Sequence, residues 1–125
     1  MQEDLKLEEV AGQGKNDEVI MCAANSYTQK YFLDPRCSRM PDNIKDDIKI
    51  LSVAFTEECG GIFLMSFDEE GNLNLSSYSD ANDYLYDEIS AGLYINKYRM
   101  ENRELFAALE TFYKIVFLDI GLDEV

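Results

Sequence analysis

Carboxylates are the side chains of this sequence with the clearest potential for chemistry. Glu57 and Glu58 adjoin near the end of one expected helix, and Asp83, Asp87 and Glu88 lie near the start of another. Residues three or four apart on a helix share a face, so Asp83 and Asp87, and less well Glu88, could meet one ligand. Paired carboxylates on facing helices hold divalent metals in some enzymes. These five residues are therefore the candidate binding site.

Histidine is absent from the sequence, which removes the commonest general base and the commonest neutral metal ligand. We therefore assign no catalytic residue, no metal ligand set and no cofactor. Of the three cysteines, Cys22 lies in an apolar run and is expected to be a core thiol. Cys59 follows two glutamates that disfavour its thiolate, and Cys37, between two arginines, is expected on an exposed loop.

The charge of the chain is strongly negative and unevenly distributed. Eleven Lys and Arg oppose 25 Asp and Glu, for a net charge of −14, and residues 50–96 contain nine acids and no Lys or Arg. Nucleic acids and anionic membranes are recognised by cationic side chains, so both are excluded as partners. We expect an acidic surface around a β-hairpin within this segment, where a basic partner protein would bind.

The segments at both ends of the chain are acidic, and the segment between them has regularly spaced apolar residues. Residues 1–18 are expected to be a flexible acidic lead-in, residues 19–118 a single domain and residues 119–125 an acidic tail. The start lacks the basic and apolar regions of a signal peptide, and the longest apolar run, residues 19–24, is far too short to span a bilayer. Three cysteines without a C-x-x-C motif fit reduced thiols, and we predict a cytoplasmic protein.

Apolar spacing predicts two N-terminal helices. The first runs from Asn16 to Asp34, with the i, i+4, i+7, i+11 stripe Ile20, Ala24, Tyr27 and Tyr31. A short strand over residues 19–22 is the alternative, because that run is continuous and rich in β-branched residues. The second helix starts near Pro41 and ends at Gly60 and Gly61, and it repeats the spacing with Ile44, Ile48, Leu51 and Phe55.

A β-hairpin and C-terminal helices complete the expected fold. Residues 62–67 form a buried strand, residues 68–72 a turn and residues 73–79 an edge strand. Residues 82–118 form one kinked helix or two consecutive helices that break within residues 96–102. Their apolar faces are marked by Leu85, Ile89 and Leu93 and by Leu105, Leu109, Phe112 and Val116. The fold class is α+β.

Four segments together resemble a known family. They read CAANSYTQKY at 22–31, FTEECGG at 55–61, FDEEGNL at 67–73 and YDEI at 86–89. In this order they resemble a family of short, acidic, uncharacterised proteins from anaerobic Gram-positive bacteria, over roughly residues 19–118. The resemblance implies a domain of unknown function and carries over no catalytic residue.

We interpret the protein as a non-enzymatic cytoplasmic interaction module. The wide apolar belt of the last helix suggests self-association, with a homodimer as the expected form. The acidic segment suggests a basic protein partner. The alternative is a small divalent-metal-dependent hydrolase that uses Glu57, Glu58, Asp83, Asp87 and Glu88.

Overall fold

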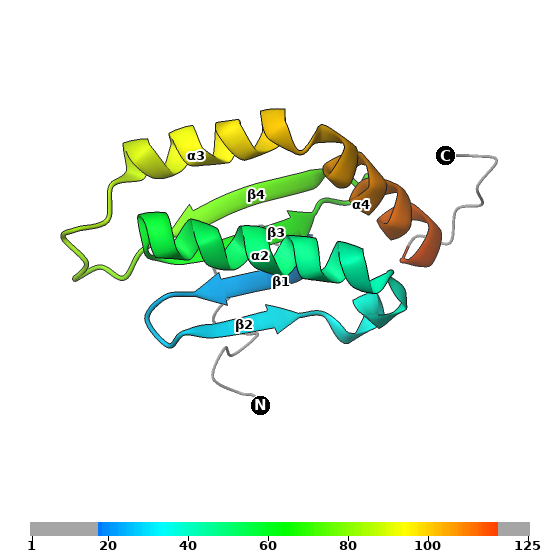
Figure 1. The fold of residues 1–125 in the computed structure, drawn as a ribbon, viewed down its shortest axis with the longest axis horizontal. Helices are drawn as coiled ribbons and strands as arrows, with labels where there is room; N and C mark the ends of the chain where they lie inside the picture. Colours follow the sequence, from blue (N-terminus) through cyan, green and yellow to red (C-terminus); the bar gives the residue numbers. More distant parts are fainter. Residues whose placement is uncertain (1–17, 118–125) are drawn as a thin grey trace.

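The computed structural model describes residues 18–117. A four-stranded antiparallel sheet carries the helices on one face (Figure 1). The elements in chain order are the strands β1 (Val19–Asn25) and β2 (Lys30–Leu33), the 3-10 helix η1 (Pro35–Arg39), the helix α2 (Asp42–Cys59), the strands β3 (Ile62–Phe67) and β4 (Leu73–Tyr78), and the helices α3 (Glu88–Glu101) and α4 (Arg103–Val116). The expected lead-in and tail lie outside the described residues, apart from Glu18.

The α+β class is correct, but the predicted order of elements is wrong, because the first expected helix is a β-hairpin. Val19–Asn25 and Lys30–Leu33 are antiparallel strands, so the strand alternative over residues 19–22 was closer. β1 is a central strand that pairs with β2 on one side and β3 on the other, in the order β2-β1-β3-β4. An apolar run buried on both faces is typical of a central strand, and sheet pairing overrides the helical spacing.

The turn between β1 and β2 has the chemistry of a tight reversal. The Asn25 side chain accepts hydrogen bonds from the backbone N–H groups of Tyr27 and Thr28, at 2.8 and 3.3 Å. Gln29 takes a left-handed conformation, with φ of 57°. Asparagine commonly stabilises such turns by bonding backbone groups two or three residues on.

The helix and the β-hairpin that were predicted in the middle of the chain are confirmed. α2 spans Asp42–Cys59 and ends at Gly60, whose φ of 75° is favourable for glycine. Its buried face includes Ile48 and Phe55, as the spacing predicts. β3 is the more buried strand of the hairpin and β4 is an edge strand, also as expected.

The C-terminal region differs from the prediction at its start. Residues 79–87 form a loop, and α3 begins at Glu88. The predicted break lies at Asn102, where φ and ψ of −126° and 35° leave the helical region and α4 follows. None of the described helices is long and apolar enough to cross a membrane.

The main core lies between the sheet and the helices. Phe55 of α2 packs against Phe63 of β3 with ring centroids 4.6 Å apart, and Tyr98 of α3 meets Phe55 edge-on at 6.1 Å. Phe67 stacks on Tyr113 of α4 at 4.2 Å. Ile20, Ala23 and Leu64 form a second, smaller buried cluster on the opposite face. Ile20 and Ala23 are three residues apart and share this face because the pairing of β1 with β3 shifts between Ile20 and Cys22.

Candidate functional site

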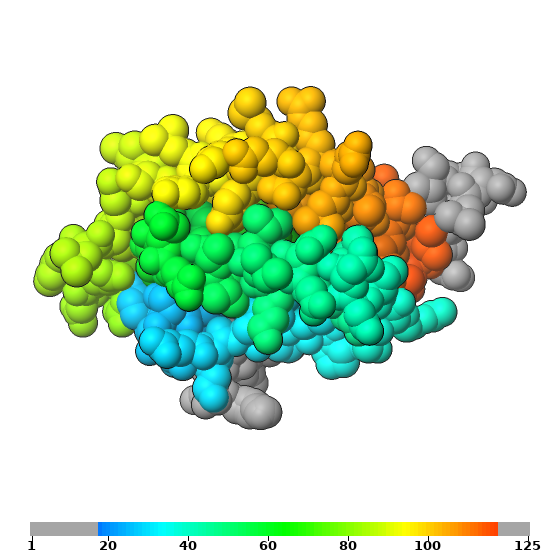
Figure 2. Space-filling view, viewed as in Figure 1, coloured from blue at the N-terminus to red at the C-terminus, as the bar shows by residue number. Residues whose placement is uncertain are grey.

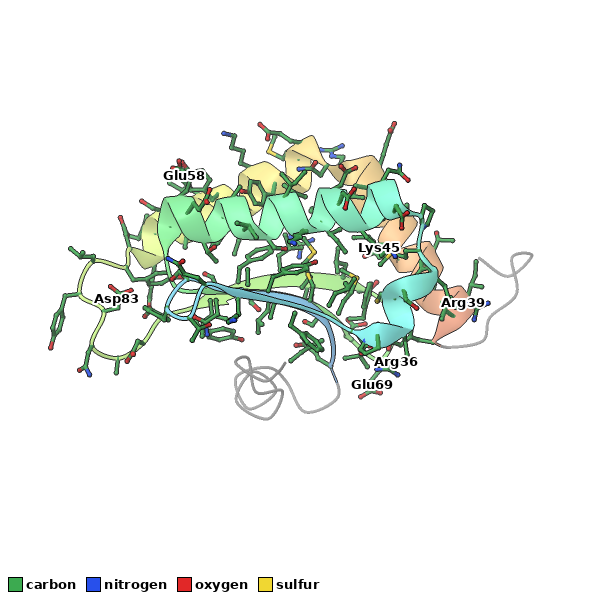
Figure 3. The ribbon with its side chains drawn as sticks, turned by 60° about the horizontal axis from the view of Figure 1, so that its bottom comes forward. Arg36, Arg39, Lys45, Glu58, Glu69 and Asp83 are labelled. Carbon is green, nitrogen blue, oxygen red and sulfur yellow. The ribbon has the colours of Figure 1, made fainter. Side chains whose placement is uncertain are left out.

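The acids of residues 50–96 divide between the two ends of the sheet. The turn between β3 and β4 carries Asp68, Glu69 and Glu70 at one end. The opposite end, which we call the acidic end, carries Glu57, Glu58, Asp80, Asp83, Asp87 and Glu88. Figure 3 shows the separation, with Glu58 and Asp83 labelled on the left and Glu69 labelled on the right. The nine acids therefore do not form one surface around the hairpin turn.

Tyr27 holds the loop of the acidic end against the β1–β2 turn. Its hydroxyl donates to Asp83 Oδ2 at 2.7 Å and accepts from the backbone N–H of Asp80 at 2.9 Å. Burial and the hydrogen bond to Asp83 raise the pKa of Tyr27. The two segments are more than 50 residues apart in sequence, and no local pattern predicts their contact.

Two other tyrosines bind the flanks of the acidic end. The Tyr94 hydroxyl of α3 donates to Glu58 Oε1 of α2 at 2.8 Å, and this bond raises the pKa of Tyr94. The Tyr86 hydroxyl is hydrogen-bonded to Ser77 Oγ of β4. Glu58 is therefore engaged with a neighbouring helix and faces away from the loop.

Asp87 has a structural role as the N-cap of α3. Its Oδ1 accepts from the backbone N–H groups of Ile89 and Ser90, and its Oδ2 accepts from Ser90 Oγ at 2.9 Å. These hydrogen bonds lower the pKa of Asp87. A charged cap at a helix N-terminus satisfies backbone donors that would otherwise lack partners.

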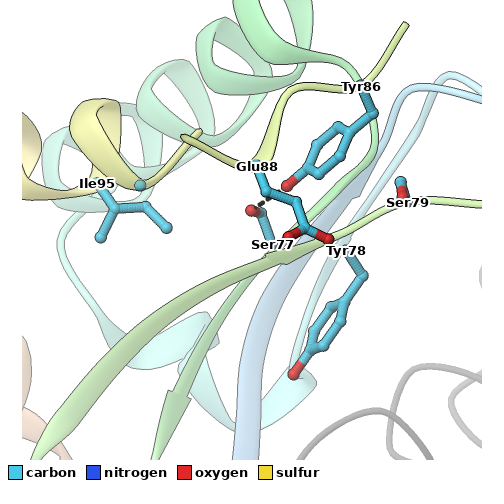
Figure 4. Close-up of a pocket in the computed structure, with 7 residues that line it drawn as sticks. Ser77, Tyr78, Ser79, Tyr86, Glu88 and Ile95 are labelled. Carbon is cyan, nitrogen blue, oxygen red and sulfur yellow. Dashed lines mark hydrogen bonds between the residues drawn. The ribbon is translucent and has the colours of Figure 1, made fainter. Parts of the chain in front are cut away.

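The remaining two candidates line separate grooves. Glu57 lies in a groove of about 600 Å³ between α2 and the β1–β2 turn, which Lys30 and Lys49 also line. Glu88 lies in another of about 590 Å³ between β4 and α3, which Figure 4 shows. The structure thus places all five predicted residues at the same end but directs them to different neighbours.

The geometry gives no support to a metal-dependent hydrolase. Within residues 18–117, no group of three or more Asp, Glu, Cys or His side chains is close enough to hold a metal ion. The prediction that Asp83 and Asp87 share a helix face is wrong, because Asp83 lies in the loop before α3 and Asp87 caps that helix. The contacts of Asp83, Asp87 and Glu58 are with different neighbours.

Apolar side chains are exposed beside these acids. Tyr84 and Leu85 in the loop are 90% and 95% exposed, and Ile89 and Leu93 of α3 are 77% and 64% exposed. The prediction that Leu85, Ile89 and Leu93 mark a core-facing side is wrong. α3 instead buries Ala91, which lies about 160° around the helix from Ile89.

The exposed side of α3 continues to its C-terminal end. Met100 is 68% exposed and follows Ile89 and Leu93 at helical spacing. We call Ile89, Leu93 and Met100 the outer stripe. Figure 2 shows α3, in yellow to orange, along one border of the molecule. Exposed apolar side chains that follow one side of a helix are typical of interaction surfaces.

The thiols are poor nucleophiles. Cys22 is fully buried, as expected, and burial raises its pKa to about 11. Cys37 is 1% exposed, so the expectation of an exposed loop cysteine is wrong, and burial raises its pKa to about 12. Burial, Glu58 and Asp87 raise the pKa of the half-buried Cys59. Nucleophilic catalysis needs the thiolate, which these surroundings disfavour.

Sequence comparison identifies a family without an assigned activity. Residues 18–121 match DUF6145, a family of unknown function. The chain belongs to this family. The resemblance to an uncharacterised domain is therefore confirmed, whereas the bacterial source and the shared acidity of the relatives remain predictions. The searches of curated proteins and of solved structures found no match.

Proposed function

We propose that this DUF6145 domain is a non-enzymatic interaction module of the cytoplasm. It binds a basic partner protein at its acidic end and associates with a second copy through the outer stripe of α3. The observation that carries the proposal is the exposure of apolar side chains directly beside a concentration of carboxylates.

The acidic end combines the two properties that a basic protein partner would recognise. Tyr84 and Leu85 are exposed almost completely, and Asp83 and Asp87 flank them in sequence. Exposed aromatic and aliphatic side chains supply area for burial, and the carboxylates steer a cationic partner and set its orientation. The loop that carries these side chains is held by Tyr27, so less conformational entropy is lost on binding.

Self-association is supported by the distribution of charge along α3. Its N-terminal end carries Asp87 and Glu88, and its C-terminal half carries Lys97, Arg99 and Glu101, of which Arg99 donates to the Leu73 carbonyl of β4. Two α3 helices that pack antiparallel along their outer stripes would place each acidic end beside Lys97 of the other helix. A two-fold axis produces this arrangement in a homodimer.

A charge-matched pair of variants tests the partner half of the proposal. Fluorescein-labelled octalysine should bind the full chain, and added salt should weaken the binding. Glu58→Gln with Glu88→Gln should reduce affinity more than Glu69→Gln with Glu70→Gln, because the second pair lies at the hairpin turn. Equal losses from the two variants, or preferential binding of octaglutamate, would contradict a specific acidic end.

Light scattering tests the proposed self-association through the outer stripe. The full chain should show a mass that rises with concentration, and Leu93→Ser with Ile89→Ser should keep it monomeric. A wild-type chain that stays monomeric at all accessible concentrations would remove self-association from the proposal.

A further inference from the structure

The free edge of β4 has a defined set of unpaired backbone groups. In the β3–β4 hairpin the Asp68 N–H donates to the Asn72 carbonyl at 3.0 Å, which marks a hydrogen-bonded pair. Because such pairs alternate in antiparallel sheets, Leu73, Leu75 and Ser77 belong to the non-bonded pairs. Their N–H and C=O groups point away from β3.

The contacts of Leu73 agree with this register. Its N–H donates to Glu110 of α4 at 2.8 Å, and its carbonyl accepts from Arg99 of α3 at 3.2 Å. The helices therefore close the edge at the start of β4. Among the described residues no such partner meets the outward backbone groups of Leu75 and Ser77. Two N–H and two C=O groups thus remain open.

A groove lies beside Ser77, one of these two open positions. It occupies about 590 Å³ between the end of β4 and α3 and is lined by Ser77, Tyr86, Glu88 and Ile95, among others. Gly92 also lines it, and an added Cβ at Gly92 would meet nothing within 4 Å. In Figure 1, α3 runs beside β4 at this edge of the sheet, in the layer of helices that covers one face. The groove between β4 and α3 therefore leaves room for an extended segment at the end of β4.

We propose that an extended segment of the basic partner binds in this groove as a fifth strand beside β4. The inference rests on the proposed function and specifies how the acidic end engages its partner. Backbone bonds to Leu75 and Ser77 supply the pairing, and a Lys or Arg side chain of the segment meets the Glu88 carboxylate. Strand addition at an open edge is a general mode of peptide recognition.

Geometry and charge select this occupant over two others. A second copy that paired β4 with β4 would bring its own α3 over the same edge, where the first α3 already lies. Residues 1–17 of the chain itself contain five acids and only two lysines. Their net negative charge would be repelled by the Glu88 carboxylate. A basic extended segment has neither disadvantage.

Peptides selected from a random twelve-residue display library against the full chain test the inference. We expect enriched peptides to contain Lys or Arg and alternating apolar residues, and to slow hydrogen exchange at the Leu75 and Ser77 amides. Gly92→Gln fills the groove and should weaken binding at least about tenfold, whereas Gly92→Ala should not. Ser77→Pro removes the outward N–H and should weaken binding similarly, whereas Ser77→Ala retains that N–H and should bind.

The outcomes separate this inference from the proposed function. Basic peptides that bind Gly92→Gln and Ser77→Pro as tightly as wild type would overturn strand addition and leave the basic-partner proposal standing. Acidic peptides, or no enrichment, would overturn both. If the Leu75 and Ser77 amides are protected in the free chain and lose protection when residues 1–16 are deleted, the chain occupies its own groove, and the partner inference is wrong.

Discussion

Truncation of Leu93 should leave the folded monomer almost unchanged, whereas the same truncation of Leu109 should damage it. Leu93 of α3 is 64% exposed and Leu109 of α4 is 1% exposed. Full burial of a leucine side chain is worth about 1.5–3 kcal/mol, so the part of Leu93 that is buried contributes about 0.5–1 kcal/mol. The higher helix propensity of alanine offsets some of this loss.

The matched variant removes the same atoms from the core. Leu109→Ala leaves a cavity as well as losing burial, and such changes cost about 2–5 kcal/mol. For a domain of this size, 1 kcal/mol corresponds to about 4–8 °C in melting temperature. We therefore expect Leu109→Ala to melt at least about 8 °C below wild type and Leu93→Ala to melt within about 4–8 °C of it.

Urea unfolding followed by circular dichroism, at two protein concentrations, checks both values. At low concentration the free energy of unfolding of Leu93→Ala should lie close to that of wild type. At high concentration wild type should gain stability through self-association, and Leu93→Ala should gain less. Equal destabilisation by the two alanine variants at both concentrations would refute the assignment of Leu93 to an exposed face.

Three further predictions concern pH, the loop and the cap. The Cys22 and Cys37 thiols have raised pKa values of about 11 and about 12, against 9.0 when unfolded, so stability should fall as pH rises from about 9 toward 12. Urea midpoints at pH 8 and 10 measure this fall, and a Cys22→Ala, Cys37→Ala double variant should flatten it; an unchanged slope would contradict the assignment. Tyr27→Phe should speed hydrogen exchange at the Asp80 amide, which loses its acceptor, and an unaltered rate would show that Tyr27 does not hold the loop. Asp87→Ala should lower the melting temperature more than Asp87→Asn, since asparagine can still cap α3; equal losses would argue against the cap.

Local signals were sufficient for the middle of the fold. α2 follows from apolar residues on one face and a glycine that ends the helix, and β3 and β4 follow from their composition and the turn between them. These features act over a few residues, so neighbours in sequence determine them. The break before α4 also lies within the predicted range.

Non-local contacts explain why the first hairpin was mistaken for a helix. Ile20, Ala24, Tyr27 and Tyr31 have helical spacing, but β1 is stabilised by pairing with β3, about 40 residues away in sequence. The sequence pattern also did not indicate which side of α3 is buried. Tyr98 packs edge-on against Phe55 and Phe63, and this contact sets the rotation of the helix.

The sequence by itself determined the acidity of the chain, the absence of histidine, and the local identity of α2, β3 and β4. Only the tertiary structure decided which acids share an end, which side of α3 meets solvent and where β4 remains open. The antiparallel sheet places Asp68–Asn72 opposite residues 79–87, so carboxylates close in sequence lie far apart. Composition and spacing are local properties, whereas proximity depends on how the strands pair and how the helices pack on them.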